Sequence, residues 1–92
     1  MKETIKTKVD ELVKIIDEFE DLINDLISGK YGEYTAMMAV QDQDTVMSIN
    51  LMIFQLEYVT IMSRYDDFND DIKEMRARSK TILEKITTHF HA

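Results

Sequence analysis

The segment from residue 46 to residue 62 is too apolar for a helix that lies on a protein surface. It belongs to a stretch without glycine or proline that begins at Tyr34 and runs to the C-terminus, and 12 of its 17 residues are apolar. At helical spacing these residues form two stripes. The first contains Val46, Ile49, Ile53 and Leu56, and the second contains Met47, Leu51, Phe54, Tyr58 and Ile61. A surface helix needs one apolar stripe. A helix with two needs partners on both sides, so the segment is predicted to be the centre of a bundle or the seam of an oligomer.

The length of the chain also favours self-association. With 92 residues it is expected to form a single helical domain, residues 1–92, and a core of that size is marginal when it folds alone. We therefore expect a homo-oligomer, a dimer or higher. The side chains expected at its seam are Met47, Leu51, Ile53, Phe54, Tyr58 and Ile61.

The absence of cysteine excludes several kinds of chemistry. A chain without cysteine has no disulfide framework, no thiolate nucleophile and no cysteine-based zinc site. It suits a reducing compartment, and we expect a cytoplasmic protein. The charged N-terminus lacks the apolar core of a signal peptide. Five polar residues interrupt the run 46–62, so no membrane span is expected.

Charge is distributed unevenly along the chain. The net charge is −7, of which residues 1–36 carry −4 and residues 37–71 carry −6, whereas residues 72–92 carry +3. The acidic total disfavours general binding to a nucleic-acid backbone. The basic segment near the C-terminus leaves a local basic patch as an alternative.

The first predicted helix has the clearest pattern. Its apolar residues alternate by four and three positions, as in the seam of a bundle; they are Ile5, Val9, Leu12, Ile16, Phe19, Ile23 and Leu26. Ser28-Gly29-Lys30 is expected to end this helix, with Gly29 in a left-handed conformation after its last turn. The pattern predicts a bundle rather than a simple coiled coil, because further apolar residues widen the stripe.

The rest of the chain is expected to form one short helix and two long ones. A short helix is predicted at 33–40, followed by a break at 41–44 where Asp42 or Asp44 caps the next helix; the alternative is a helix that continues through this tract. The central helix is predicted at 44–64, with a break near 65–67 because Asp and Asn cluster over 66–71. One long helix over 44–90 is the rival interpretation, since heptad spacing crosses the break.

No constellation of residues in the sequence is typical of an active site. His89 and His91 are two residues apart, so on a helix they point to different faces. The two glycines cannot form a phosphate loop, and the acidic run 66–71 lacks the glycine and glutamate of a calcium loop. Glu18, Asp21 and Asp25 share a helix face and resemble part of a magnesium site, although such spacing is common on solvated helices. No catalytic residue, cofactor or metal is therefore expected.

Two charge stripes have a structural and a functional interpretation. Asp17, Asp21 and Asp25 stack on the first helix, where like charges disfavour the helix. The basic residues of the last helix are Lys73, Arg76, Arg78 and Lys80. The structural interpretation places the first and last helices side by side so that the stripes pair. The functional interpretation leaves the basic stripe free to bind an anionic ligand.

A contact surface for a protein partner is predicted at the turn that follows the first helix. Tyrosine and methionine provide large, adaptable contact area, and four such residues lie here: Tyr31, Tyr34, Met37 and Met38. The alternative is that the tyrosines merely cover the end of the core.

These observations predict an all-α bundle that acts as a non-enzymatic interaction protein. We expect an oligomeric regulator or inhibitor that binds and blocks a protein partner, a role frequent among small acidic helical proteins of phages and mobile elements. Three alternatives stay open: an oligomer that sequesters a small nucleotide through the basic stripe, a nucleic-acid mimic, and a small metal-dependent nucleotide hydrolase of the helical kind.

Overall fold

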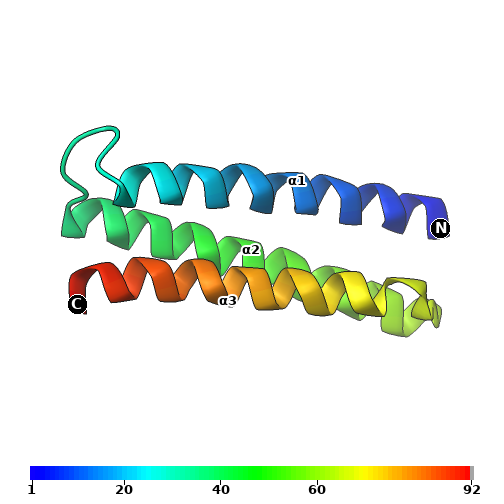
Figure 1. Cartoon of the computed structure of the whole chain (residues 1–92). Coiled ribbons are helices and arrows are strands. Elements are labelled where there is room, and N and C mark those ends of the chain that lie inside the picture. The colour runs from blue at the N-terminus through cyan, green and yellow to red at the C-terminus, as the bar shows by residue number, and fades with distance from the viewer. Residues whose placement is uncertain (92) are drawn as a thin grey trace.

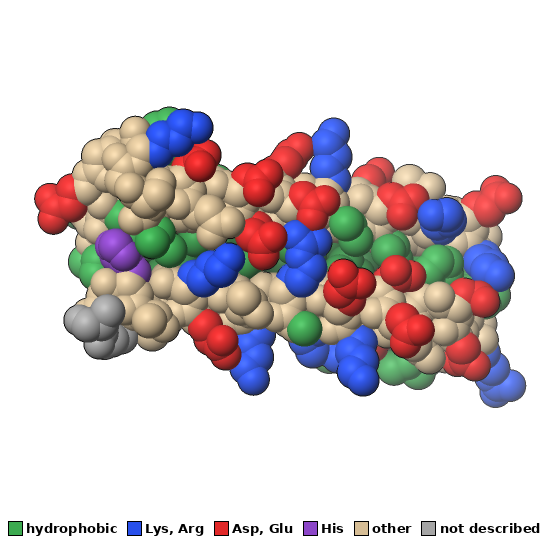
Figure 2. All heavy atoms as spheres, viewed as in Figure 1, with side chains coloured by type: hydrophobic (Ala, Val, Ile, Leu, Met, Phe, Trp, Pro, Cys, Tyr) green, Lys and Arg blue, Asp and Glu red, His purple; other side chains and the backbone are tan. Residues whose placement is uncertain are grey.

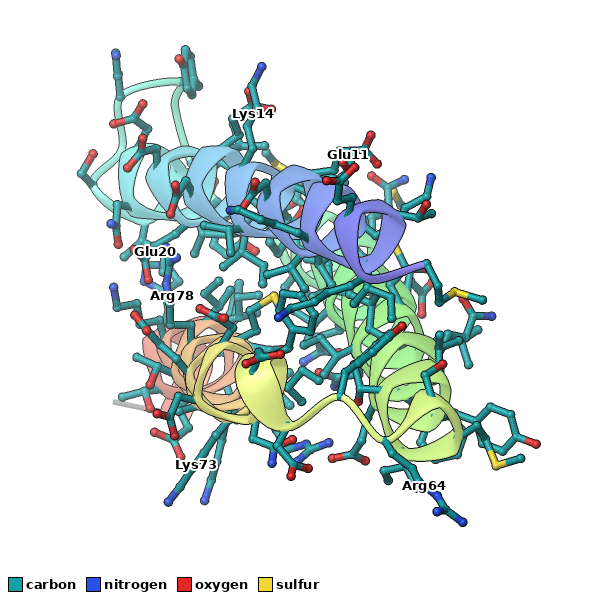
Figure 3. All side chains as sticks on the ribbon, turned by 90° about the vertical axis from the view of Figure 1, so that its right-hand side faces the viewer. Glu11, Lys14, Glu20, Arg64, Lys73 and Arg78 are labelled. Carbon is teal, nitrogen blue, oxygen red and sulfur yellow. The ribbon has the colours of Figure 1, made fainter. Side chains whose placement is uncertain are left out.

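Three long helices pack side by side along one axis in the computed structural model, which describes residues 1–91. The helices are α1 (Lys2–Ile27), α2 (Ala36–Ser63) and α3 (Asn69–His91), and a single 3-10 turn, η1 (Asp66–Phe68), precedes α3. Successive helices run in opposite directions, so the chain goes up, down and up (Figure 1). The bundle measures 45 × 20 × 18 Å. Seen along its axis, the helices occupy the corners of a triangle (Figure 3). The predicted all-α bundle is confirmed.

The core lies along the axis of this triangle, and α1 contributes the side chains that its sequence pattern predicted. Every residue of the predicted seam is buried; the seven are Ile5, Val9, Leu12, Ile16, Phe19, Ile23 and Leu26. From α3, Ile72, Met75, Ile82 and Ile86 complete the core. Burying side chains of this size stabilises the fold by about 1.5–3 kcal/mol each before entropy is counted.

Helix α2 is longer than predicted. The short helix expected at 33–40 and the break expected at 41–44 are therefore wrong. The helix begins at Ala36 and continues through the polar tract. Its N-cap is Thr35, whose Oγ1 accepts a hydrogen bond from the backbone N–H of Met38 at 3.3 Å. Neither Asp42 nor Asp44 is a cap. Asp42 instead accepts a hydrogen bond from the buried Tyr34 hydroxyl.

The ends of α1 and α2 have the same geometry. Beyond α1, Gly29 adopts φ +85°; its N–H donates to Leu26 O, and the N–H of Lys30 donates to Asp25 O. Gly29 was predicted in this role. After α2, Arg64 takes the equivalent left-handed position at φ 58°. The N–H groups of Arg64 and Tyr65 donate to Ile61 O and Thr60 O.

The break predicted near 65–67 is confirmed, and the single helix over 44–90 is wrong. The chain leaves α2 at Ser63 and turns through η1, and α3 begins at Asn69. Phe68 is buried in the turn and closes this end of the core. Continuous heptad spacing did not prevent the break because α3 folds back and buries its apolar stripe against α2.

Candidate interaction surface

The two apolar stripes of α2 differ in burial in the folded chain. The first stripe faces the core: Val46, Ile49 and Ile53 are each 1% exposed, and Leu56 packs against them partly buried. The second stripe faces solvent. Its members are 58–68% exposed; they are Met47, Leu51, Phe54, Tyr58 and Ile61. Ile53 was assigned to the oligomer seam, and this assignment is wrong because Ile53 is a core residue of its own bundle.

We call the solvent-facing stripe, together with Val40 and Met62, the α2 apolar face. Val40 is 57% exposed and Met62 is 65% exposed, and both extend the stripe at helical spacing. Over these residues α2 rises about 30 Å. A fully solvated side chain of this size presents about 200 Å², so the seven residues leave on the order of 900 Å² exposed. This exceeds the largest apolar patch of a typical monomer, about 300–600 Å².

A shallow groove borders the α2 apolar face on the side of α1. Its volume is about 380 Å³. The lining residues are Lys8, Glu11, Leu12, Ile15, Met52, Gln55, Leu56 and Val59. Ile15 and Met52 are 40% and 36% exposed, so apolar surface continues from α2 onto the flank of α1. Lys8 and Glu11 pair with each other at 3.5 Å at its rim.

A second groove borders the face on the side of α3, and it contains part of the basic stripe. Its volume is about 330 Å³, and it is lined by Asn50, Ile53, Phe54, Arg76, Lys80 and Leu83. The Arg76 guanidinium lies 2.7 Å from a carboxylate oxygen of Glu57 on α2. Lys73 points away from the bundle (Figure 3). Here Arg76 and Lys80 lie next to an exposed aromatic ring.

Arg78 does not share this site, because it points toward α1. Its Nη2 lies 2.6 Å from Asp17 Oδ1 and 3.3 Å from Glu20 Oε1, and the Arg78–Glu20 pair bridges the two helices in Figure 3. Partial burial lowers the pKa of Arg78, but the hydrogen bonds and charges of Asp17 and Glu20 together outweigh it and the pKa is raised. The four basic residues predicted as one anion-binding stripe are thus divided between two sides of α3.

The face formed by α1 and α3 is different in character. Acidic and basic side chains are interleaved over it, and apolar side chains show mainly in the seam between the helices (Figure 2). Lys85 Nζ donates to Asn24 Oδ1 across this seam at 3.2 Å. The predicted pairing between first and last helix is therefore seen through Arg78, whereas Asp25 pairs with Lys30 on its own side of the molecule at 3.5 Å.

The turn predicted to bind a partner contains both exposed and buried residues. Tyr31 is 61% exposed and Met37 is 75% exposed, whereas Met38 is half-buried. Tyr34 is only 4% exposed, and its hydroxyl donates to Asp42 Oδ2 at 2.5 Å. Burial and then this hydrogen bond raise the pKa of Tyr34. Tyr34 therefore covers the end of the core and is not available as a contact residue, which corrects its assignment.

The end of the bundle next to Tyr34 carries an aromatic cluster. The Tyr34 ring centroid lies 5.5 Å from that of His89 and 5.6 Å from that of Phe90. His89 also lines a groove of about 540 Å³ between α1 and α3. The side chain of His91 lies outside the described part of the structure. The cluster closes this end of the core.

Within residues 1–91, no group of three or more His, Asp or Glu side chains is placed to hold a metal ion. Glu18, Asp21 and Asp25, considered as part of a magnesium site, are not brought together with further ligands.

Sequence reasoning missed two polar contacts that position α2. The Ser79 hydroxyl of α3, 1% exposed, donates to Asn50 Oδ1 of α2 at 2.5 Å, and Thr35 caps the helix. Both depend on tertiary packing or on the true start of α2, so local pattern gave little signal.

By length and composition α2 is the one described helix that could cross a membrane, a test that core helices of soluble proteins also pass; 22% of its most apolar window is buried.

Comparison with protein families, with curated proteins and with solved structures finds no match for this chain.

Proposed function

We propose that this chain is a non-enzymatic interaction protein that forms a homo-oligomer through the α2 apolar face and binds and blocks a protein partner. The observation that supports the proposal is the exposure of Met47, Leu51, Phe54, Tyr58 and Ile61 in an otherwise charged, acidic bundle. Contiguous apolar surface of this extent marks an interaction site. Its central residues include a phenylalanine and a tyrosine, and aromatic side chains contribute a large part of the binding free energy when they are buried at an interface.

A membrane span is the main competing use for an apolar helix, and α2 is a poor candidate for it. Burying Asp44, Asn50 or Glu57 in lipid carries a free-energy penalty, and Glu57 is tied to Arg76 of α3. The core stripe of α2 is also already occupied by its own bundle. We propose a protein that does not span a membrane and works in the cytoplasm, where disulfides are rare and a chain needs no cysteine for stability.

The partner-binding surface is proposed at the end of the bundle next to the α1–α2 turn. Tyr31 is exposed in the turn between α1 and α2, and Met37 is exposed in the first turn of α2; turns supported by rigid helices are favourable contact sites. Unlike Tyr34, neither residue is needed to cover the core. The oligomer would present several copies of this surface, which raises avidity for a partner.

Sedimentation velocity at micromolar concentration tests the oligomer. The wild type should sediment above the 10.8 kDa of one chain, and Leu51→Asp should sediment as a folded monomer because it removes apolar area from the shared face. Lys14→Asp, on the outer side of α1 (Figure 3), is the matched control and should not change the mass. A wild type that is monomeric throughout the range would refute this part of the proposal.

A second experiment tests the partner. Tyr31→Ala/Met37→Ala and the wild type are used as baits in lysate of the native host, with bound proteins identified by mass spectrometry. We expect a specific protein to be captured by the wild type and lost with the double variant, while the melting temperature stays unchanged. Capture that is equal for both baits would place the binding surface elsewhere.

Sequestration of an anionic ligand is a second candidate, and one observation favours it. Arg76, Lys80 and the exposed Phe54 ring line a common groove, which combines cations with a surface on which a nucleotide base can stack. Purification followed by ultraviolet spectroscopy of the denatured supernatant tests this candidate. Arg76 is already neutralised by Glu57, which is why we rank the candidate second. The interleaved charges of Figure 2 do not favour a nucleic-acid mimic.

A further inference from the structure

We infer that the occupant of the α2 apolar face is a second copy of this chain, packed antiparallel to the first about a two-fold axis between Leu51 and Phe54. The inference rests on the proposed self-association and adds the partner surface, the orientation and the register. In this arrangement Leu51 of one copy lies opposite Phe54 of the other, and Asp44 lies opposite the far end of the partner's α2, near Ile61 and Arg64.

The area of the face matches what a dimer needs. A stable interface removes about 800 Å² from each partner, and the seven residues of the α2 apolar face expose on the order of 900 Å². These residues are 57–68% exposed in the isolated chain; they are Val40, Met47, Leu51, Phe54, Tyr58, Ile61 and Met62. One helix packed on its copy can therefore cover the whole face without any rearrangement of the bundle.

The spacing of the face is that of a two-helix seam. From Val40 the positions alternate by four and three residues through Asp44, Met47, Leu51, Phe54, Tyr58 and Ile61. The side chains that flank this line are uncharged over the central part of α2, because residues 45–56 contain no acidic or basic group. Two copies can approach there without burying a charge.

Asp44 decides the orientation, because it is the only charged residue on the line from Val40 to Ile61. A parallel pair would place the two Asp44 carboxylates against each other in the seam, where like charges repel. In an antiparallel pair centred between Leu51 and Phe54, Asp44 and Ile61 each lie about 13 Å from the axis along the helix and so face each other. Arg64, one turn beyond Ile61, is exposed and points away from its own bundle (Figure 3). Its guanidinium is the opposite charge that Asp44 can reach.

The remaining charges of the bundle do not oppose this arrangement. The two-fold axis puts α3 of both copies on the same side, with Lys73, Arg76 and Lys80 of each. Since packed helices are about 9 Å apart, two α3 helices separated by two α2 helices are about 25 Å apart. That distance exceeds the Debye length of about 8 Å at physiological salt, and Glu57 already pairs with Arg76.

Disulfide trapping tests the orientation, and the chain suits it because it has no cysteine. Asp44→Cys and Ile61→Cys are prepared singly, since both positions are exposed in the folded chain. Each is oxidised alone and after mixing with the other, and covalent dimers are measured on a non-reducing gel. We expect a dimer in the mixture, up to about half of the chains by statistical exchange, and little in either variant alone. Lys14→Cys, on the outer side of α1, is the control that reports random collision.

A charge exchange between Asp44 and Arg64 provides an independent test that leaves the apolar residues of the seam unchanged. Asp44→Lys should weaken the dimer, because it places a lysine beside Arg64 of the second copy, and Asp44→Lys/Arg64→Glu should restore it. Dissociation constants from sedimentation equilibrium measure both effects. We expect a loss of about fivefold or more for the single variant, equivalent to about 1 kcal/mol, and recovery of most of it in the double variant.

The outcomes separate this inference from the proposed function. Strong dimers of Asp44→Cys alone would show a parallel pair, which overturns the inference and leaves self-association through α2 intact. An oligomer in sedimentation without any trapped dimer, and without a response to the charge exchange, would place the second copy on another surface and also overturns the inference. A monomeric wild type overturns both the inference and the proposed oligomer.

Discussion

Ile53 and Phe54 are neighbours in the sequence but lie on different faces of α2, with Ile53 1% exposed and Phe54 60% exposed. A change to aspartate should therefore have different consequences at the two positions. Ile53→Asp places an unpaired charge in the core, which costs several kcal/mol, and should unfold the chain. Phe54→Asp should leave the helix content and the fold intact and should instead lower the sedimenting mass.

Circular dichroism and sedimentation velocity on both variants check this contrast. The wild type and Lys14→Asp are the controls. If Ile53→Asp keeps a native melting curve, then the core stripe has been assigned to the wrong side of α2. If Phe54→Asp unfolds the chain at the same denaturant concentration as Ile53→Asp, the exposed stripe is part of the core in solution.

Tyr34→Phe should remove part of the alkaline instability of the protein. Burial and the hydrogen bond to Asp42 raise the pKa of Tyr34 above its ordinary value of 10.0. The folded chain therefore keeps a proton that the unfolded chain releases. The stabilising contribution is complete below pH 10 and is lost as the pH rises from 10 toward the folded-state pKa, by about 1.4 kcal/mol per pH unit at most.

Urea unfolding between pH 8 and pH 11 measures this effect. We expect the wild type to lose more stability than Tyr34→Phe over pH 10–11, and the difference between the two should be constant below pH 9. Tyr31→Phe, at an exposed position, controls for tyrosine ionisation in general. Parallel curves for the wild type and Tyr34→Phe across the whole range would contradict a buried, hydrogen-bonded hydroxyl.

Arg64→Gly should stabilise the protomer. Arg64 ends α2 with φ 58°, a conformation that costs a residue with a side chain about 1 kcal/mol and that glycine adopts freely. Phe54→Asp provides a monomeric background in which the loss of the guanidinium at the dimer seam has no effect. We expect the free energy of unfolding to rise by about 0.5–1 kcal/mol there. Gly29→Ala, at φ +85°, is the opposite change at the end of α1 and should lower stability by a similar amount.

Arg78 and Asp17 should show measurable coupling between α3 and α1. Their atoms lie 2.6 Å apart and the arginine side chain is only 23% exposed, so solvent screens the pair incompletely. A double-mutant cycle with Arg78→Ala and Asp17→Ala measures the coupling, which we expect at about 0.5–1 kcal/mol. The matched pair Lys6–Asp10 is 66% and 64% exposed and should give less than about 0.5 kcal/mol. Equal coupling in the two cycles would contradict a half-buried bridge.

The sequence predicted α1 almost completely because its pattern has one solution. A single apolar stripe with four-and-three spacing is expected to face inward, and Gly29 favours the left-handed conformation that ends the helix. The break before α3 was also predictable, since Asp and Asn prefer helix starts to helix interiors. The two stripes of α2 were visible for the same reason: helical periodicity assigns each apolar residue to a face before any packing is known.

The sequence could not determine which apolar stripe of α2 is buried in the core of its own bundle. Ile53 was placed at the seam and Tyr34 at a contact surface, yet both are buried. Periodicity groups residues by face, but only the positions of α1 and α3 select the face that becomes the core. The sequence pattern likewise did not show that Asp42 accepts a hydrogen bond from Tyr34, eight residues earlier in the chain.

The sequence by itself therefore determined that the chain is helical, that α1 has one buried face and that the central segment has two apolar faces. The tertiary structure decided that Val46, Ile49 and Ile53 are covered by α1 and α3 while Met47, Leu51 and Phe54 stay exposed. It also divided the basic residues of α3, with Arg78 turned to α1 and Arg76 to α2. The physical reason is that local propensity acts within a helix, whereas burial depends on which helices pack together, and packing energy decides between faces that are equally apolar.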